Sequence, residues 1–351
     1  MTDSLFIRAC FNKPTERTPV WIMRQAGRYL PQYRAIRAGH SFTEMYKTPE
    51  LATEVTLQPV DALGVDAAIL FSDILVVPEA MGMELRFIEG RGPVFSEPLR
   101  NEQQVLGLRE VESNESLSFV MQTINTLRRE LSGRVPLIGF CGAPWTLATY
   151  MVEGGASRHY RHIKEWRFKR PDMLETLLSR VTDALIDYCR AQMDAGVQAL
   201  QIFDSWAGLL DEEGFEQLAL KYVRKLIGAI RRPGVPLIYF PRGGMLWLEK
   251  LGDLGADVIG LDWNIAPRRA RELAAGRFAL QGNLDPTALY AGEEQVRRHT
   301  RKMLEGFGRG TGHIANLGHG ILPDIPVENA RAFVETIQSE SAGFRNTEQA
   351  V

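Results

Sequence analysis

The sequence predicts an α/β fold in which eight short strands and the helices between them close into a single (β/α)8 barrel of the TIM type. Eight short apolar runs recur along the chain, each separated from the next by sequence of helical periodicity. The runs are continuously apolar, which is typical of strands buried on both faces of a parallel sheet. Alternating strands and helices imply such a sheet, and eight repeats imply closure. An open doubly wound sheet is the alternative, but no G-x-G-x-x-G turn follows the first strand.

The eight predicted strands follow one another in chain order. They cover residues 20–23, 66–71, 136–140, 199–203, 237–240, 258–261, 278–280 and 313–316. Each ends in polar residues or in a glycine-containing turn, as a strand does where it leaves a buried sheet.

Helix signals fill the intervals between these strands. Pro31 begins a brief helix, and residues 41–44 have the spacing of a capping box. Thr48 and Pro49 suit the start of a longer helix that runs towards Gly64. Further helices are predicted over 117–131, 171–195, 213–231 and 327–341, a solvated basic helix over 158–170, and a loop over 89–98. We expect the polar tail after about residue 343 to be disordered.

Composition limits the classes of function. The 351 residues are 45% hydrophobic and 24% charged, which suits one large domain spanning 1–351. The net charge of -2 gives no support for a nucleic-acid partner. No apolar run approaches the roughly 18 residues of a membrane helix, and the first residues lack the pattern of a signal peptide. The three scattered cysteines (Cys10, Cys141 and Cys189) fit a reducing cytoplasm.

The first predicted strand is followed by a concentration of arginine. Arg24 and Gln25 come directly after its last apolar residue, and Arg28, Arg34 and Arg37 follow. Guanidinium is planar and permanently charged, and its paired N–H groups match carboxylate or phosphate. A solvated face behind a buried strand is the alternative reading. The position at a strand end favours an anion-binding site, because function gathers there in barrels of this kind.

The other predicted strand ends carry further polar groups. They are Asp73, Asp204, Ser205, Arg242, Asp262, Asp285 and His319, with Tyr150 just beyond the third strand. Each alone has a structural explanation, since aspartates cap helices and a single histidine is usually structural. Together they outline the mouth of an active-site cleft at the carboxyl ends of the strands. No H-E-x-x-H or paired C-x-x-C motif indicates a metal site. Glycines at 282 and 318–320 leave a phosphate site as an alternative.

Five segments in order resemble the uroporphyrinogen decarboxylase family. They are MRQAGRYLP at 23–31, FSDIL at 71–75, GFCGAPWT at 139–146, FDSW at 203–206 and NLGHG at 316–320. The resemblance covers essentially the whole chain. It implies a distorted barrel, a homodimer, a bacterial cytoplasmic setting, and no cofactor or metal. The implied reaction removes the four acetate carboxyl groups of uroporphyrinogen III as CO2 and gives coproporphyrinogen III.

The resemblance also implies which residues act. The expected catalytic residues are Asp73, Arg24, Arg37 and Tyr150. The expected substrate-binding residues are Arg24, Gln25, Ala26, Gly27, Arg28, Asp73, Tyr150, Ser205 and His319. Asp73 is expected to face the four pyrrole N–H groups and to stabilise the cationic ring that forms when a pyrrole carbon is protonated. The proton donor stays open among Arg24, Arg37, Tyr150 and water, because guanidinium is a weak acid near neutral pH.

Two other functions stay open at this point. A corrinoid-dependent methyltransferase would share the barrel, but it uses zinc held by histidine and cysteine, and no such ligand set is visible. A non-enzymatic anion-binding barrel would explain the arginines but would leave Asp73 without a purpose.

Overall fold

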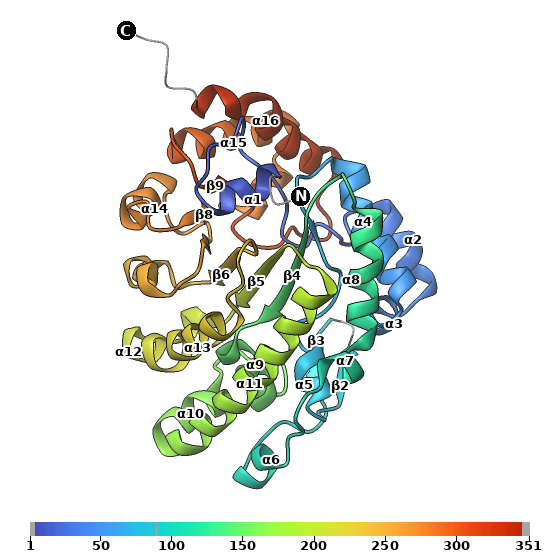
Figure 1. Ribbon diagram of the computed structural model, residues 1–351, viewed down its shortest axis with the longest axis vertical. Coiled ribbons are helices and arrows are strands. Elements are labelled where there is room, and N and C mark those ends of the chain that lie inside the picture. Colours follow the sequence, from blue (N-terminus) through green and yellow to red (C-terminus); the bar gives the residue numbers. More distant parts are fainter. Residues whose placement is uncertain (1–3, 89, 346–351) are drawn as a thin grey trace.

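A curled sheet of seven parallel strands forms the centre of the computed structural model, which describes residues 4–88 and 90–345 (Figure 1). The strand order is β1-β4-β5-β6-β7-β8-β9, so each strand pairs in parallel with the strand of this sheet that follows it in sequence. The strands are β1 (Ala68–Ile69), β4 (Leu137–Gly142), β5 (Ala199–Asp204), β6 (Leu237–Pro241), β7 (Val258–Gly260), β8 (Ala279–Gln281) and β9 (His313–Ile314). Seven of the eight predicted strands are thereby confirmed.

The prediction of a first strand over 20–23 is wrong. This segment forms no strand and makes one isolated parallel bridge, between Val20 and Ala315. The backbone of residues 19 and 20 still bonds to the segments beside the two edge strands, β9 and β1. Ala315 N–H donates to Pro19 O (2.8 Å), and Asp66 N–H donates to Val20 O (2.7 Å). At Ile22 and Met23, side chains accept the backbone hydrogen bonds that a neighbouring strand would accept in a sheet. The Ile22 N–H donates to a glutamine side chain and the Met23 N–H to an asparagine side chain.

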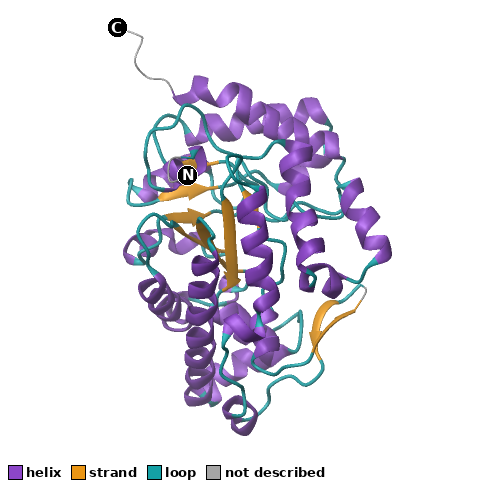
Figure 2. Cartoon of the chain, turned by 45° about the vertical axis from the view of Figure 1, so that its right-hand side comes forward, coloured by secondary structure: helices purple, strands orange, loops and turns teal. Residues whose placement is uncertain are grey.

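Helices surround the sheet and connect its strands (Figures 1 and 2). They are α1 (Leu5–Cys10), α2 (Pro31–Gly39), α3 (Phe42–Lys47), α4 (Pro49–Leu63), α5 (Val76–Ala80), α6 (Glu102–Leu106), α7 (Ser113–Ser116), α8 (Ser118–Glu130), α9 (Pro144–Glu153), α10 (Arg161–Lys169), α11 (Pro171–Ala195), η1 (Ala207–Leu209), α12 (Glu212–Gly214), η2 (Phe215–Leu220), α13 (Lys221–Ile230), η3 (Met245–Asp253), α14 (Pro267–Ala274), η4 (Pro286–Tyr290), α15 (Glu293–Phe307) and α16 (Val327–Arg345).

The helix signals in the sequence are confirmed where caps mark them. Ser41 and Glu44 form the predicted capping box of α3. Helix α4 ends at Gly64 and α11 at Gly196, and both glycines have a positive φ, 68° and 110°. Glycine adopts that conformation without the penalty that a side chain would incur, which is why the sequence predicts these two helix ends.

Three boundaries differ from the prediction. The helix expected over 213–231 is divided into α12, a π-helical segment η2 and α13. Helix α16 continues to Arg345, past the expected end at 341 and into the first residues of the tail expected to be disordered, and the remaining tail, 346–351, lies outside the described residues. The loop expected over 89–98 contains β3.

Strand β3 (Gly92–Phe95) pairs antiparallel with β2 (Leu85–Ile88). Figure 2 shows this hairpin apart from the parallel sheet. Gly90 and Gly92 have positive φ, 74° and 78°, as turn glycines do. Those glycines gave the sequence its loop character, although the residues beside them form strands.

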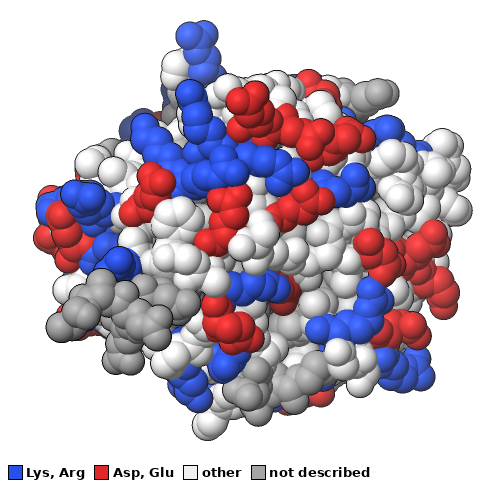
Figure 3. Space-filling model, turned by 90° about the horizontal axis from the view of Figure 1, so that it is seen from above, with Lys and Arg blue, Asp and Glu red and all other residues white. Residues whose placement is uncertain are grey.

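Surface charge is mixed at the end of the molecule where α15 and α16 lie. Figure 3 shows Lys and Arg in a band flanked by Asp and Glu. Ion pairs join the two helices there, from Arg297 to Glu335 (2.8 Å) and from Arg301 to Glu340 (2.7 Å). In the described part of the chain, no helix is long and apolar enough to cross a membrane.

Candidate active site

Segments that follow several strands line a cavity of about 1250 Å³. Residues 72–75 follow shortly after β1, Ser205 comes directly after β5, and His319 lies in the loop after β9. Residues 23, 24 and 26–29 line the cavity from the end of the first predicted strand and the turn after it, and Tyr150 reaches it from α9. The cavity therefore draws its polar groups from parts of the chain nearly 300 residues apart (Arg24 to His319).

All but one of the site residues that the family resemblance implies line this cavity. They are Arg24, Ala26, Gly27, Arg28, Arg37, Asp73, Tyr150, Ser205 and His319. The exception is Gln25, which is fully buried. Its side chain accepts from Ile22 N–H (3.0 Å) and donates to Ala67 O (3.1 Å). This amide holds the backbone together beside the sheet, and the predicted contact of Gln25 with substrate stays a prediction.

The remaining aspartates at strand ends make structural contacts outside the cavity. Asp204 is fully buried and accepts from Thr146 Oγ1 (2.6 Å) and from the Tyr239 hydroxyl (2.8 Å). Burial raises its pKa to about 6. Asp262 accepts from two backbone N–H groups of nearby turns, and Asp285 caps η4. The capping explanation thus fits Asp285, whereas Asp262 holds turn backbone and caps no helix.

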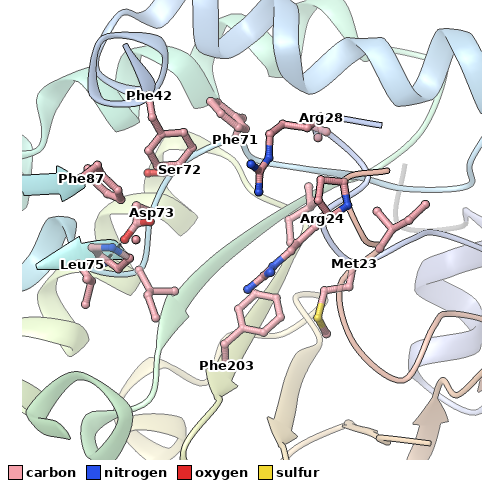
Figure 4. A pocket seen from close by; sticks show the side chains of 18 of the residues that line it. Met23, Arg24, Arg28, Phe42, Phe71, Ser72, Asp73, Leu75, Phe87 and Phe203 are labelled. Atoms are coloured by element: carbon pink, nitrogen blue, oxygen red, sulfur yellow. Dashed lines mark hydrogen bonds between the residues drawn. The ribbon is translucent and has the colours of Figure 1, made fainter. Parts of the chain in front are cut away.

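Asp73 lies inside the cavity with one oxygen already bonded. Its Oδ1 accepts from Leu75 N–H at 2.8 Å. Burial raises the pKa of this carboxyl to about 6, although that N–H and the positive charge of Arg24 act in the opposite direction. Figure 4 shows Asp73 on one side of the pocket, beside Leu75 and Phe87, with Arg24 and Arg28 on the other. The carboxyl is mostly ionised near neutral pH and faces a space bounded by cations.

Arg24 combines an unusual backbone with a side chain that extends into the cavity (Figure 4). Its φ is 64°, in the left-handed region that residues with side chains seldom adopt. Such conformations persist where the surroundings enforce them, and they concentrate at functional sites. Burial lowers the pKa of its guanidinium, and the positive charges of Arg242 and Arg28 act in the same direction.

His319 and Tyr150 are uncharged near neutral pH. Burial and the neighbouring Arg24 and Arg242 lower the pKa of His319 to about 3, so the imidazole is neutral. Burial raises the pKa of Tyr150 to about 12, so the phenol keeps its proton. The His319 ring stacks on Phe240, with 6.1 Å between centroids. Both side chains therefore act as neutral hydrogen-bonding groups.

Aromatic residues form much of the cavity wall, and the sequence reasoning missed them. Phe42 packs edge to face against Phe71 (centroids 5.7 Å apart) and Phe87 (4.8 Å). Phe140 and Phe203 form a second pair at 5.7 Å. Phe71, Phe140 and Phe203 all lie near the ends of predicted strands, which was a usable signal. Phe42 and Phe87 come from α3 and the hairpin, and no pattern in the sequence pointed to them.

Among residues 4–88 and 90–345, no three side chains of His, Cys, Asp or Glu are grouped so that they could hold a metal ion. The charged groups of the cavity are instead arginines facing one carboxylate.

Comparisons with known proteins agree closely with one another. The sequence model of the family described as "Uroporphyrinogen decarboxylase (URO-D)" matches residues 1–340. A protein of Hahella chejuensis named "Uroporphyrinogen decarboxylase" is 48% identical over 349 residues, covering 98% of each chain. One of the same name from Syntrophotalea carbinolica is 50% identical over 335 residues, covering 95% of this chain and 97% of the relative.

Solved structures match in fold. A methyltransferase from Methanosarcina mazei superposes with a TM-score of 0.81 at 22% identity, covering 96% of this chain and 98% of its own. A B12-independent methionine synthase from Shewanella sp. W3-18-1 gives a TM-score of 0.55 at 13% identity, covering 92% and 96%. At these identities the likeness is one of architecture.

Proposed function

The chain belongs to the uroporphyrinogen decarboxylase family, and from this premise we propose that the cavity around Asp73 is where its substrate binds and reacts. The enzyme is a carboxy-lyase of porphyrin and haem biosynthesis. It removes the four acetate carboxyl groups of uroporphyrinogen III as CO2 and forms coproporphyrinogen III. The observation that carries the proposal is the placement of a single carboxylate opposite several arginines within one aromatic-walled cavity.

The lining suits each part of this substrate. A tetrapyrrole with eight carboxylates needs several cations, and Arg24, Arg28 and Arg37 lie along the lining. Its flat rings suit the phenylalanine wall. The four pyrrole N–H groups point towards the ring centre, where Asp73 supplies the negative charge and the free oxygen to accept from them.

The same arrangement suits the chemistry. Protonation of a pyrrole carbon makes the ring cationic, so the electron pair of the breaking bond between the methylene and the carboxylate carbon flows into the ring as CO2 leaves. A second proton then reaches the methylene carbon, giving a methyl group and restoring the ring by loss of the first proton. Each round exchanges one CO2 for one proton overall. Asp73 stabilises the positive charge in a site where the field of a carboxylate is weakly screened.

The same electrostatics bear on two of the four candidate proton donors, and Arg37 and water stay open beside them. Burial moves the pKa of Tyr150 upward and that of Arg24 downward. Of these two candidates, Arg24 is the one whose acidity the cavity increases. Tyr150, Ser205 and His319 then serve as neutral groups that orient carboxylates and bound water.

We also propose that residues 19–23 complete a closed barrel and that the cavity opens at the carboxyl ends of its strands. The hydrogen bonds of Pro19 and Val20 to both ends of the sheet support this closure. The family further supports a single domain, a homodimer, a cytoplasmic location and a reaction without cofactor. Analytical ultracentrifugation of the full chain tests the dimer, since a monomer at micromolar concentration would contradict it.

Two arginine variants test the location of the site. Arg24→Ala removes a cation from the cavity, whereas Arg298→Ala removes an exposed one from α15. We expect kcat/KM for uroporphyrinogen III, followed as oxidised porphyrin products, to fall by roughly 10²-fold in Arg24→Ala and to stay unchanged in the control. Equal activity of the two folded variants would place the reaction elsewhere.

A further inference from the structure

The loop after β9 holds the backbone that leads into Arg24. The Met23 N–H donates to Asn316 Oδ1 at 2.9 Å, and the Met23 carbonyl accepts from Ile321 N–H at 2.9 Å. Asn316 Oδ1 also accepts from its neighbour Leu317 N–H at 2.7 Å, so the amide is fixed to its own loop. The backbone N–H and carbonyl of Met23 are thus both bonded to the loop. Met23 directly precedes Arg24, whose φ is left-handed.

A glycine in the same loop leaves room for the Arg24 side chain. A Cβ atom built on Gly320 would lie 2.7 Å from Arg24 Cγ and 2.8 Å from Arg24 Nε, and nearer still to Arg24 Cδ. Real Cβ contacts essentially never fall below 3.0 Å. The φ of Gly320 is outside the left-handed region, so its backbone does not require glycine. Arg24 occupies the space that a side chain at position 320 would take. This is why only glycine fits there.

We propose that Gly320 is a positioning residue for Arg24, and that Asn316 fixes the backbone from which this side chain starts. The missing side chain at 320 opens the path along which the arginine reaches the cavity. With a methyl group there, the arginine must rotate away, and its guanidinium moves from the place where it meets substrate. This inference rests on the proposed role of Arg24.

A second glycine of the loop separates this role from ordinary packing. A Cβ atom on Gly318 would lie 2.5 Å from the backbone nitrogen of Trp263 and 3.0 Å from the backbone carbon of Asp262. Backbone cannot rotate aside as a side chain does, so Gly318→Ala should destabilise the fold whatever stands at position 24. Gly228, on α13, has no atom within 4 Å of such a Cβ and provides a neutral control.

A double-mutant cycle tests the proposal. We expect Gly320→Ala to lower kcat/KM for uroporphyrinogen III by roughly 10- to 10²-fold in the otherwise unchanged enzyme, because a displacement of about 1 Å suffices for such a loss. In the Arg24→Ala background the same change should alter kcat/KM by less than about twofold, because the obstructed atoms are gone. Gly228→Ala should change neither value.

If the Gly320→Ala protein folds poorly, a comparison of melting temperatures still tests the proposal. A clash with the arginine predicts that Arg24→Ala restores the melting temperature of the Gly320→Ala protein, whereas it should not restore that of Gly318→Ala. Equal losses from Gly320→Ala in both backgrounds, or full activity of the single variant, would overturn the proposal. If Arg24→Ala itself kept full activity, the proposed function of the cavity would fail instead.

Discussion

At the scale of single residues, burial decides the charge of each polar group in the cavity. Asp73 and His319 both lose hydration, and for both the charged form becomes less favourable. The consequence is opposite in sign, since the acid gains a higher pKa (about 6) and the base a lower one (about 3). At pH 7 the cavity therefore holds one carboxylate, a neutral imidazole and a neutral phenol among its arginines.

This difference predicts the pH dependence of the reaction. We expect kcat/KM to fall as the pH drops through about 6, because protonation removes the charge of Asp73. His319 is already neutral there, so His319→Gln should lower the rate without moving this acidic limb. The check is a profile of kcat/KM from pH 5 to 8 for both proteins. Loss of the limb in His319→Gln would assign it to the imidazole.

Burial of a functional carboxylate also affects stability. Between its ordinary pKa of 3.8 and its folded value of about 6, the native state of Asp73 binds a proton that the unfolded state has lost. Stability contributed by this group therefore decreases as the pH rises through that range, and the full cost is present above it. We expect Asp73→Asn to raise the free energy of unfolding at pH 7.5 by on the order of 1 kcal/mol, allowing for partial solvent access.

Thermal melting checks this expectation. The gain of Asp73→Asn over the unchanged protein should shrink towards zero below about pH 4, where the carboxyl is protonated in both states. A lower melting temperature for the variant at pH 7.5 would show that the carboxylate stabilises the fold.

At the scale of elements, caps and buried runs were predictable, and groups brought together by folding were not. Helix α11 and strands β4 to β9 follow from continuous apolar runs and glycine stops. Residues 20–23 have the composition of a strand, but the polar side chains of Gln25 and Asn316 take up the backbone N–H groups of the last two. The π-helical segment η2 has no distinguishing pattern, and the role of Gly320 depends on a side chain almost 300 positions away (Arg24).

Helix α2 supplies a further test at this scale. Its first turn is fixed by Pro31, and it brings Arg37 to the cavity lining as an exposed side chain that donates to His40 O. We expect Arg37→Ala to impair turnover at least about tenfold while the melting temperature stays unchanged. Gln32→Ala, on the same helix but outside the lining, is the control. An unchanged kcat/KM with all four acetates still removed would make Arg37 a surface charge only.

At the scale of the whole molecule, the fold gathers distant segments around a substrate that supplies its own electron sink. Arg24, Arg28 and Arg37 meet the carboxylate after β1 and the imidazole after β9 in one cavity, because parallel strands carry their ends to the same side. The family motifs made these residues predictable individually. Their separation into a cationic side and an anionic side, and the phenylalanines beside them, appear with the folded chain (Figure 4).

An electron sink within the substrate predicts activity without added metal. Dialysis against a strong chelator should leave the conversion of uroporphyrinogen III to coproporphyrinogen III unchanged. Activity that is lost on dialysis and restored by zinc would show that the reaction needs a metal ion.

Replacement of Asp73 tests the central claim most directly. Asp73→Asn keeps the shape but removes the charge and turns one acceptor into a donor that faces the pyrrole N–H groups. Asp73→Glu keeps the charge but moves the oxygens by about 1 Å, enough to disturb a positioned site. Asp61→Asn, an exposed carboxylate of α4 paired with Arg134, is the control.

The measurement is kcat/KM for uroporphyrinogen III in these variants, with thermal melting to confirm that each is folded. We expect a fall of roughly 10²–10³-fold for Asp73→Asn, a clear loss for Asp73→Glu and no change for the control. A well-folded Asp73→Asn protein that turns over at nearly the rate of the unchanged enzyme would contradict the central role of this carboxylate.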